Sequence, residues 1–188
     1  MESNKYIQKF IGDWNIKTIL GILIGAVVFG FLMNFCSILV YSKIYFTASM
    51  IVPVVVGAYF GPLPAAIATG LGNIFADVVR QSDIYYNWAI GNAVLGLFVG
   101  ALPLYGANIR KGIFEVKHIV LYSLLCVVGC GFAFVGIVPV FTVIFFDGQL
   151  QITLTETLIG SIMDIVVLLV LGIPILKFLA NKNSHKQL

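Results

Sequence analysis

Long runs of apolar residues alternate with short clusters of charged and turn-forming residues along the whole chain. A helix needs about 20 mostly apolar residues to cross a hydrocarbon layer roughly 30 Å thick, and by this measure the pattern predicts six membrane-spanning helices. They lie between Lys17 and Lys43, from about Tyr45 to Phe60, from the Gly61-Pro62-Leu63-Pro64 turn to near Arg80, from near Tyr85 to around Gly106, from about Ile119 to Phe146, and between Glu156 and Lys177. The second segment is short for a full crossing, which leaves an alternative with five spans and one half-inserted segment.

The composition supports a membrane protein. Of the 188 residues, 60% are hydrophobic and 10% are charged, whereas a soluble domain carries about 25% charged residues. A core of this size cannot hide so many apolar side chains from water, so a soluble enzyme, a disordered chain and a disulfide scaffold are excluded. The predicted fold class is an all-α integral membrane protein in the lipid bilayer. Its single six-helix domain covers residues 16–180, between an N-terminal segment 1–15 and a tail 181–188.

The basic residues predict how the chain is oriented in the membrane. Nine of the eleven lie on one side of the predicted spans: Lys5, Lys9, Lys17, Arg110, Lys111, Lys117, Lys177, Lys182 and Lys186, against Lys43 and Arg80 on the other. The positive-inside rule then predicts that both termini face the cytoplasm. The net charge of +3 is accounted for by this asymmetry, and no nucleic-acid partner is expected.

Polar residues inside the predicted spans gather in the outer halves of the helices. We expect a substrate-binding cavity that opens outward and is lined by Asn34, Asn73, Asp77, Trp88, Asn92 and Asp164. Buried acidic residues in membrane spans are costly and usually face a cavity or a partner. The inner halves are almost purely apolar, so no continuous polar path through the membrane is predicted.

Each of these residues also has a purely structural interpretation. Asp77 and Asn73 share one helix face, and Asp77 is three residues from Arg80, with which it can form an interhelical staple. Asp164 can form a hydrogen bond between helices, and Trp88 can belong to an interfacial aromatic belt instead of stacking on a planar ligand.

Small residues form a second pattern. Gly21-x-x-x-Gly25-Ala26 lies in the inner half of the first predicted helix, and similar Gly-x-x-x-Gly spacings occur at 57–61 and 96–100. Such spacing lets a second helix approach closely. The second helix belongs either to the same chain or to a partner subunit.

Several functions are not supported by the residues. There is no G-x-x-x-x-G-K-[ST] phosphate loop, and neither His118 nor His185 lies inside a predicted span. An ATPase and an intramembrane serine or zinc protease are therefore not expected. A channel needs polar lining along its whole pore. We predict no enzymatic activity, no cofactor and no metal.

The stretch from Ile51 to Leu102 resembles the S components of energy-coupling factor (ECF) transporters, particularly the riboflavin-type group. The similar features are FGPLPA at 60–65, a G-x-x-x-D segment ending at Asp77, and W-A-I-G at 88–91 leading into G-L-x-x-G at 96–100. The family often has His where this chain has Asn73.

The resemblance implies a small six-helix subunit of a prokaryotic cell membrane that captures a vitamin near the external face. Such subunits depend on a scaffold transmembrane subunit and two cytoplasmic ATPase subunits. They are similar in using small residues of the first helix, usually A-x-x-x-A, to dock on the scaffold. Gly21 and Gly25, followed by Ala26, occupy the matching place here.

The sequence therefore predicts a substrate-capture subunit of an ECF-type importer, with riboflavin favoured over another vitamin or small nutrient. One alternative is an autonomous proton-coupled secondary transporter that uses Asp77 or Asp164 as proton carrier. A third is a purely structural membrane protein without a ligand.

Overall fold

The computed structural model describes residues 2–41 and 44–185. Lys43 and Lys186, which entered the charge count above, lie outside these ranges. The elements are α1 (Glu2–Ile11), α2 (Ile16–Phe35), β1 (Ser37–Tyr41), β2 (Ile44–Thr47), η1 (Ala48–Met50), α3 (Ile51–Phe60), α4 (Pro62–Val79), α5 (Tyr86–Val99), η2 (Leu102–Tyr105), η3 (Ile109–Lys111), α6 (Val116–Cys130), η4 (Gly131–Ile137), α7 (Val138–Phe146), α8 (Leu150–Val167), η5 (Leu168–Gly172) and α9 (Ile173–Ser184).

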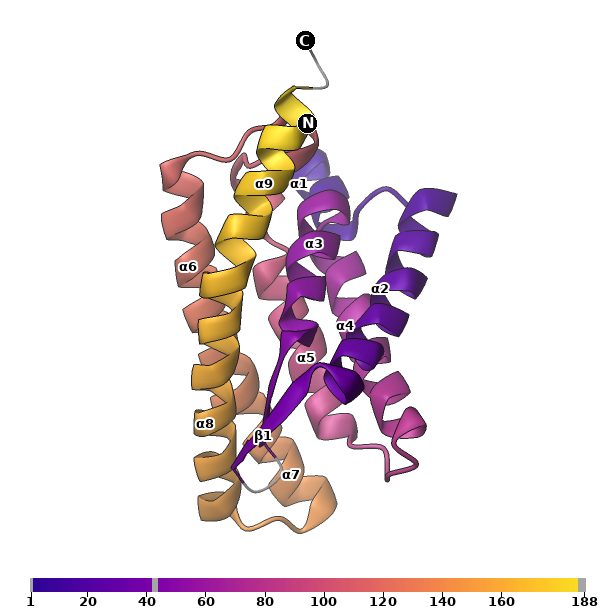
Figure 1. The fold of residues 1–188 in the computed structure, drawn as a ribbon, viewed down its shortest axis with the longest axis vertical. Helices are drawn as coiled ribbons and strands as arrows, with labels where there is room; N and C mark the ends of the chain where they lie inside the picture. Colours follow the sequence, from indigo (N-terminus) through magenta and orange to yellow (C-terminus); the bar gives the residue numbers. More distant parts are fainter. Residues whose placement is uncertain (1, 42–43, 186–188) are drawn as a thin grey trace.

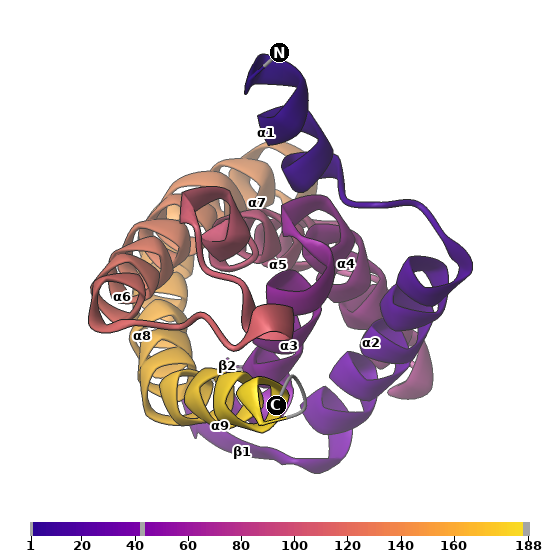
Figure 2. The same ribbon diagram turned by 90° about the horizontal axis from the view of Figure 1, so that it is seen from above.

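The long helices run side by side between two ends of an elongated bundle (Figure 1). One end, called here the terminal end, carries α1 and the last turns of α9. The other, called the hairpin end, carries the β1–β2 hairpin and the turn between α7 and α8. Seen along its long axis, the bundle is a ring of helices, and α1 lies outside that ring (Figure 2).

Within residues 2–41 and 44–185, five helical segments are long and apolar enough to cross a membrane. They are Ile16–Phe35, Pro62–Val79, Tyr86–Tyr105, Val116–Phe146 and Leu150–Ser184, and a shorter apolar segment covers Ala48–Phe60. A mainly helical membrane protein is thus confirmed. The shorter segment corresponds to the second predicted span, which is short for a full crossing. Six full spans therefore stay a prediction.

The β1–β2 hairpin corrects the predicted boundaries of the first two segments. Helix α2 ends at Phe35, and residues that were expected to be helical form an antiparallel pair with Ser37 opposite Thr47 and Leu39 opposite Tyr45. This stretch is rich in β-branched and aromatic residues, which favour extended backbone. The second pass through the bundle therefore begins as a strand and continues as η1 and α3.

The last helical segment also begins earlier than expected. Residues 147–155 were expected to form an external loop, but α8 starts at Leu150. Asp147 ends α7 in the left-handed conformation with a φ of 49°, and only 147–149 are left to turn the chain.

Two π-helical turns interrupt the long segments, and in each case a proline lies two residues after the end of the turn. The turn η4 comes before Pro139, and η5 comes before Pro174. A proline lacks the backbone N–H that an α-helix needs, so the preceding turn widens instead of keeping the regular bonds. At η5 the carbonyl of Leu168 accepts a hydrogen bond of 3.0 Å from the hydroxyl of Tyr122.

The Gly-x-x-x-Gly face of α2 is turned toward helices of the same chain. A Cβ atom added to Gly21 would lie 2.5 Å from the ring of Phe60, and one added to Gly25 would lie 2.9 Å from Val56 and 3.3 Å from Ala68. Ala26 is only 7% exposed. These contacts correspond to the alternative of internal packing, because a helix of another subunit could reach Gly25 only by displacing Val56 and Ala68.

Candidate functional site

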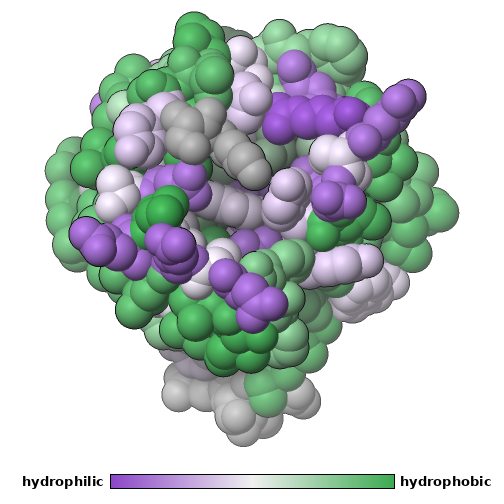
Figure 3. Space-filling view, turned by 90° about the horizontal axis from the view of Figure 1, so that it is seen from below, coloured by the Kyte–Doolittle hydropathy of each residue, from purple (hydrophilic) through white to green (hydrophobic). Residues whose placement is uncertain are grey.

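A cavity of about 620 Å³ lies at the hairpin end. Side chains from α2, β2, η1, α4, α5, η4, α7 and α8 line it, together with the turns that follow α4 and α7. Viewed from this end, polar and apolar groups surround a hollow in the middle of the bundle (Figure 3). The volume falls within the usual range of roughly 300–1,000 Å³ for small-molecule pockets.

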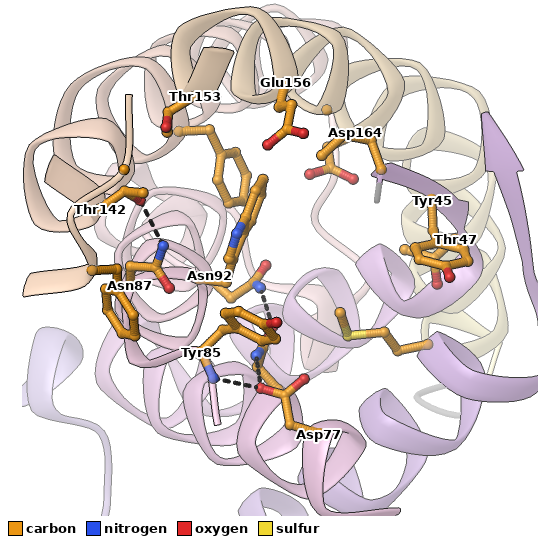
Figure 4. Close-up of a pocket in the computed structure, with 18 of the residues that line it drawn as sticks. Tyr45, Thr47, Asp77, Tyr85, Asn87, Asn92, Thr142, Thr153, Glu156 and Asp164 are labelled. Carbon is orange, nitrogen blue, oxygen red and sulfur yellow. Dashed lines mark hydrogen bonds between the residues drawn. The ribbon is translucent and has the colours of Figure 1, made fainter. Parts of the chain in front are cut away.

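A chain of hydrogen bonds joins α4 to α5 on one side of the cavity (Figure 4). The Asn92 side-chain amide donates to Oδ1 of Asn73 at 2.8 Å, and the Asn73 amide donates to Oδ2 of Asp77 at 3.2 Å. The backbone N–H of Tyr85 donates to the same Asp77 oxygen at 3.1 Å. Asp77 thus fixes the turn before α5 and the direction of both asparagine amides, and the shared helix face of Asn73 and Asp77 is confirmed.

Arg80 is held by groups other than the Asp77 carboxylate. Its Nη2 donates to the backbone carbonyl of Met33 at 2.6 Å, and its guanidinium lies 4.7 Å from the centre of the Tyr45 ring. A planar guanidinium stacks favourably on an aromatic face. Arg80 therefore ties α4 to the end of α2 and to strand β2, and the alternative in which it forms an ion pair with Asp77 is not what the described residues show.

The opposite wall is formed by α8, where Glu156, Gly160 and Asp164 follow one another at helical spacing. Both carboxylates point into the cavity (Figure 4). Asp164 is 7% exposed, and no hydrogen bond or ion pair joins it to any residue that the structure describes.

Aromatic side chains form the wall between α5 and η4. The rings of Trp88 and Phe134 are 5.7 Å apart with an interplanar angle of 36°. A Cβ atom added to Gly160 would lie 3.8 Å from Cη2 of Trp88, so the indole lies against α8 one turn before Asp164. The absence of a side chain at Gly160 leaves the indole ring in contact with this wall.

Five of the six predicted substrate-binding residues line this cavity: Asn73, Asp77, Trp88, Asn92 and Asp164. Asn34 does not. Its side-chain amide donates to the carbonyl of Ala76 at 3.1 Å, which places it between α2 and α4.

The structure adds lining residues that the sequence interpretation did not single out as site residues, among them Tyr45, Thr47, Phe134, Thr142 and Glu156. Tyr45 and Thr47 reach the cavity because their segment is a strand. Glu156 shares a face with Asp164 at a spacing of eight residues, a signal present in the sequence once α8 is extended to Leu150. Asn87 donates to Thr142 at 2.6 Å and so joins α5 to α7 at the rim.

The site has the chemistry of a binding pocket. Within the described ranges no group of three His, Cys, Asp or Glu side chains is placed to hold a metal ion. Amides, carboxylates, hydroxyls and aromatic rings converge on one cavity. This combination binds and orients a small molecule.

Comparison with known proteins agrees with this description. The family model of the ECF-type riboflavin transporter S component matches residues 13–181. A UPF0397 protein of Clostridium perfringens strain ATCC 13124 is 25% identical over 182 residues, covering 92% of this chain and 93% of the relative. A UPF0397 protein of Staphylococcus aureus strain JH9 is 24% identical over 176 residues, covering 93% and 95%. No solved structure matches the chain. Because the family model covers most of its length, the chain belongs to the ECF-type riboflavin transporter S component family, which is a family of transporter subunits and not of enzymes.

Proposed function

We propose that this chain captures a vitamin-sized nutrient in the cavity at the hairpin end, with riboflavin as the first candidate. A separate scaffold subunit and two ATPase subunits then drive its uptake. The observation that carries the proposal is the cavity itself, which is large enough for a small organic molecule and lies between the helices of the bundle. Membership of the S component family supports the same function.

An apolar layer closes the cavity toward the terminal end. On α5 the cavity residues Trp88 and Asn92 are followed by Leu95 and Val99, which are 1% and 2% exposed. On the neighbouring α3, Val54 is 2% exposed. A second cavity of about 430 Å³ lies beyond this layer and is lined by residues of the terminal end. The layer supports a subunit that binds its substrate but needs partners to move it across the membrane.

Charge supports the direction of capture. The basic residues of the terminal end include Lys9, Lys17, Arg110, Lys111 and Lys182. We propose that this end faces the cytoplasm. The hairpin end then faces outward, and the substrate enters from the external side.

The decisive experiment is to purify the chain in detergent, release any bound small molecule and identify it by mass spectrometry. A yellow preparation that releases riboflavin is the expected result for the first candidate. The same protein in liposomes should bind the released compound without accumulating it, and uptake should appear only when scaffold and ATPase subunits are supplied. Accumulation by the chain alone in a proton gradient would favour proton-coupled transport, and absence of any bound or binding compound would reject capture.

A further inference from the structure

The carboxylate of Asp164 is the least satisfied charged group in the cavity. It is 7% exposed, it points into the cavity (Figure 4), and none of the described residues forms a hydrogen bond or an ion pair with it. A carboxylate removed from water is costly unless a hydrogen-bond donor or a cation faces it. The described side chains around Asp164 do not supply that partner.

The acidic side chains that line the cavity differ in the partners that the described residues give them. Asp77, Glu156 and Asp164 are acidic, and Arg80 is the one basic side chain in the described part of the lining. Arg80 is engaged with the Met33 carbonyl at 2.6 Å and with the Tyr45 ring. Asp77 accepts its hydrogen bonds from Asn73 and Tyr85. Among the described residues, the acidic side chain of the lining that is left without a hydrogen bond or an ion pair is therefore that of Asp164 on the α8 wall.

An aromatic surface lies beside this negative wall. Trp88 reaches to within one helical turn of Asp164 at Gly160, and its ring packs near that of Phe134. A cation next to a carboxylate and over an indole ring is stabilised by both, through charge-assisted hydrogen bonds and through the cation–π interaction.

We infer that the nutrient captured here carries a cationic nitrogen group, of the amidinium or protonated amino-heterocycle type, attached to a flat ring. The nitrogen group donates hydrogen bonds to Asp164, and the ring lies against Trp88. This inference rests on the proposed function, the capture of a small nutrient, but it selects a cationic ring compound in place of riboflavin, whose ring is neutral. A site for a neutral ring would have a different composition, because the Asp164 carboxylate would then stay buried without a cation or a donor from the described residues.

Benzamidine and benzamide test this inference, because they share one flat ring and nearly one shape but differ in charge. Dissociation constants of both are measured by ligand-observed NMR titration on the full chain in detergent. The wild-type protein should prefer benzamidine about tenfold or more, as expected for charge-assisted hydrogen bonds in a buried site. Asp164→Asn should reduce the preference to about twofold or less, and Asp164→Glu, which keeps the charge, should retain most of it.

Asp83→Asn is the matched control, because this carboxylate is exposed and does not line the cavity. It should leave the preference unchanged. Equal affinities for the two probes, no binding of benzamidine, or a preference that survives in Asp164→Asn would each overturn the inference. Tight binding of riboflavin that benzamidine does not compete with would overturn it as well. None of these results would reject nutrient capture itself, which fails only if no compound binds to the purified chain.

Discussion

Asp77 offers the sharpest test of how the site is held together. Its carboxylate is 4% exposed, and its Oδ2 atom accepts from the Asn73 amide and from the Tyr85 backbone N–H. Asp77→Ala removes the acceptor of the buried Asn73 amide and of the half-buried Tyr85 N–H. Each donor that loses its acceptor costs about 1–3 kcal/mol, so the free energy of unfolding should fall by about 2–6 kcal/mol. For a domain of this size, that corresponds to a decrease in Tm of roughly 4–24 °C.

Asp77→Asn separates hydrogen bonding from charge. The asparagine keeps one oxygen, and the Tyr85 N–H, which only donates, selects the rotamer that places this oxygen where Oδ2 was. Both hydrogen bonds are then retained, and the expected loss is below about 1 kcal/mol. Thermal unfolding in detergent and affinity for the compound released from the wild-type protein are measured on both variants.

The result that refutes this reasoning is specific. If Asp77→Ala unfolds at the wild-type temperature but no longer binds, Asp77 contacts the ligand directly and the hydrogen bonds to Asn73 and Tyr85 contribute little. If Asp77→Asn is as damaging as Asp77→Ala, the negative charge is required rather than the position of the acceptor. Loss of stability and affinity together in the alanine variant alone is the outcome that the structure predicts.

Three further variants probe the packing and the aromatic wall. Gly25→Leu should lower Tm and ligand affinity together, because overpacking costs about 1–3 kcal/mol. The control Ile24→Leu lies on the same helix at a side chain that is 61% exposed, and it should change neither quantity. Loss of ATP-driven uptake by Gly25→Leu with normal stability would instead show partner docking. Gly172→Ala directs a methyl group onto the Tyr122 hydroxyl and should destabilise the chain by about 1–3 kcal/mol. In a Tyr122→Phe background the same substitution should cost clearly less, and additive unfolding energies would contradict this contact. Trp88→Leu should weaken binding about two- to tenfold in a titration with the released compound, and an unchanged affinity would remove the indole from the site.

Hydropathy predicted most of the helices because crossing a membrane requires length and apolarity, and both can be measured on the sequence. It misplaced the boundaries around residues 36–47 for a physical reason. A short apolar strand and the end of an apolar helix have the same hydropathy, and no alternation separates them when both faces are apolar. The remaining signal for a strand was the high content of β-branched and aromatic residues. The strand that they form places Tyr45 and Thr47 at the cavity.

Depth in the bundle could be predicted better than direction around a helix. Asn34 and Asn73 were placed at similar depth, but the structure turns Asn73 toward the cavity and Asn34 toward the backbone of Ala76. Hydropathy carries little directional information in a membrane helix, because the lipid-facing side and the packed side are both apolar. Which face of a helix packs against the rest of the protein depends on its neighbouring helices. Those neighbours are set by contacts between residues that are distant in the sequence.

Spacing within one helix was the exception, since residues three or four apart share a face whatever the neighbours are. This is why Asn73 and Asp77 could be paired in advance, and why Glu156, Gly160 and Asp164 form one wall. The glycine in that row leaves the Trp88 indole beside the carboxylate wall. A buried carboxylate costs free energy unless a donor or a cation faces it, and none of the described residues forms a hydrogen bond or an ion pair with Asp164. This carboxylate, placed in the cavity wall by helix spacing, is the observation on which our inference of a cationic group on the captured nutrient depends.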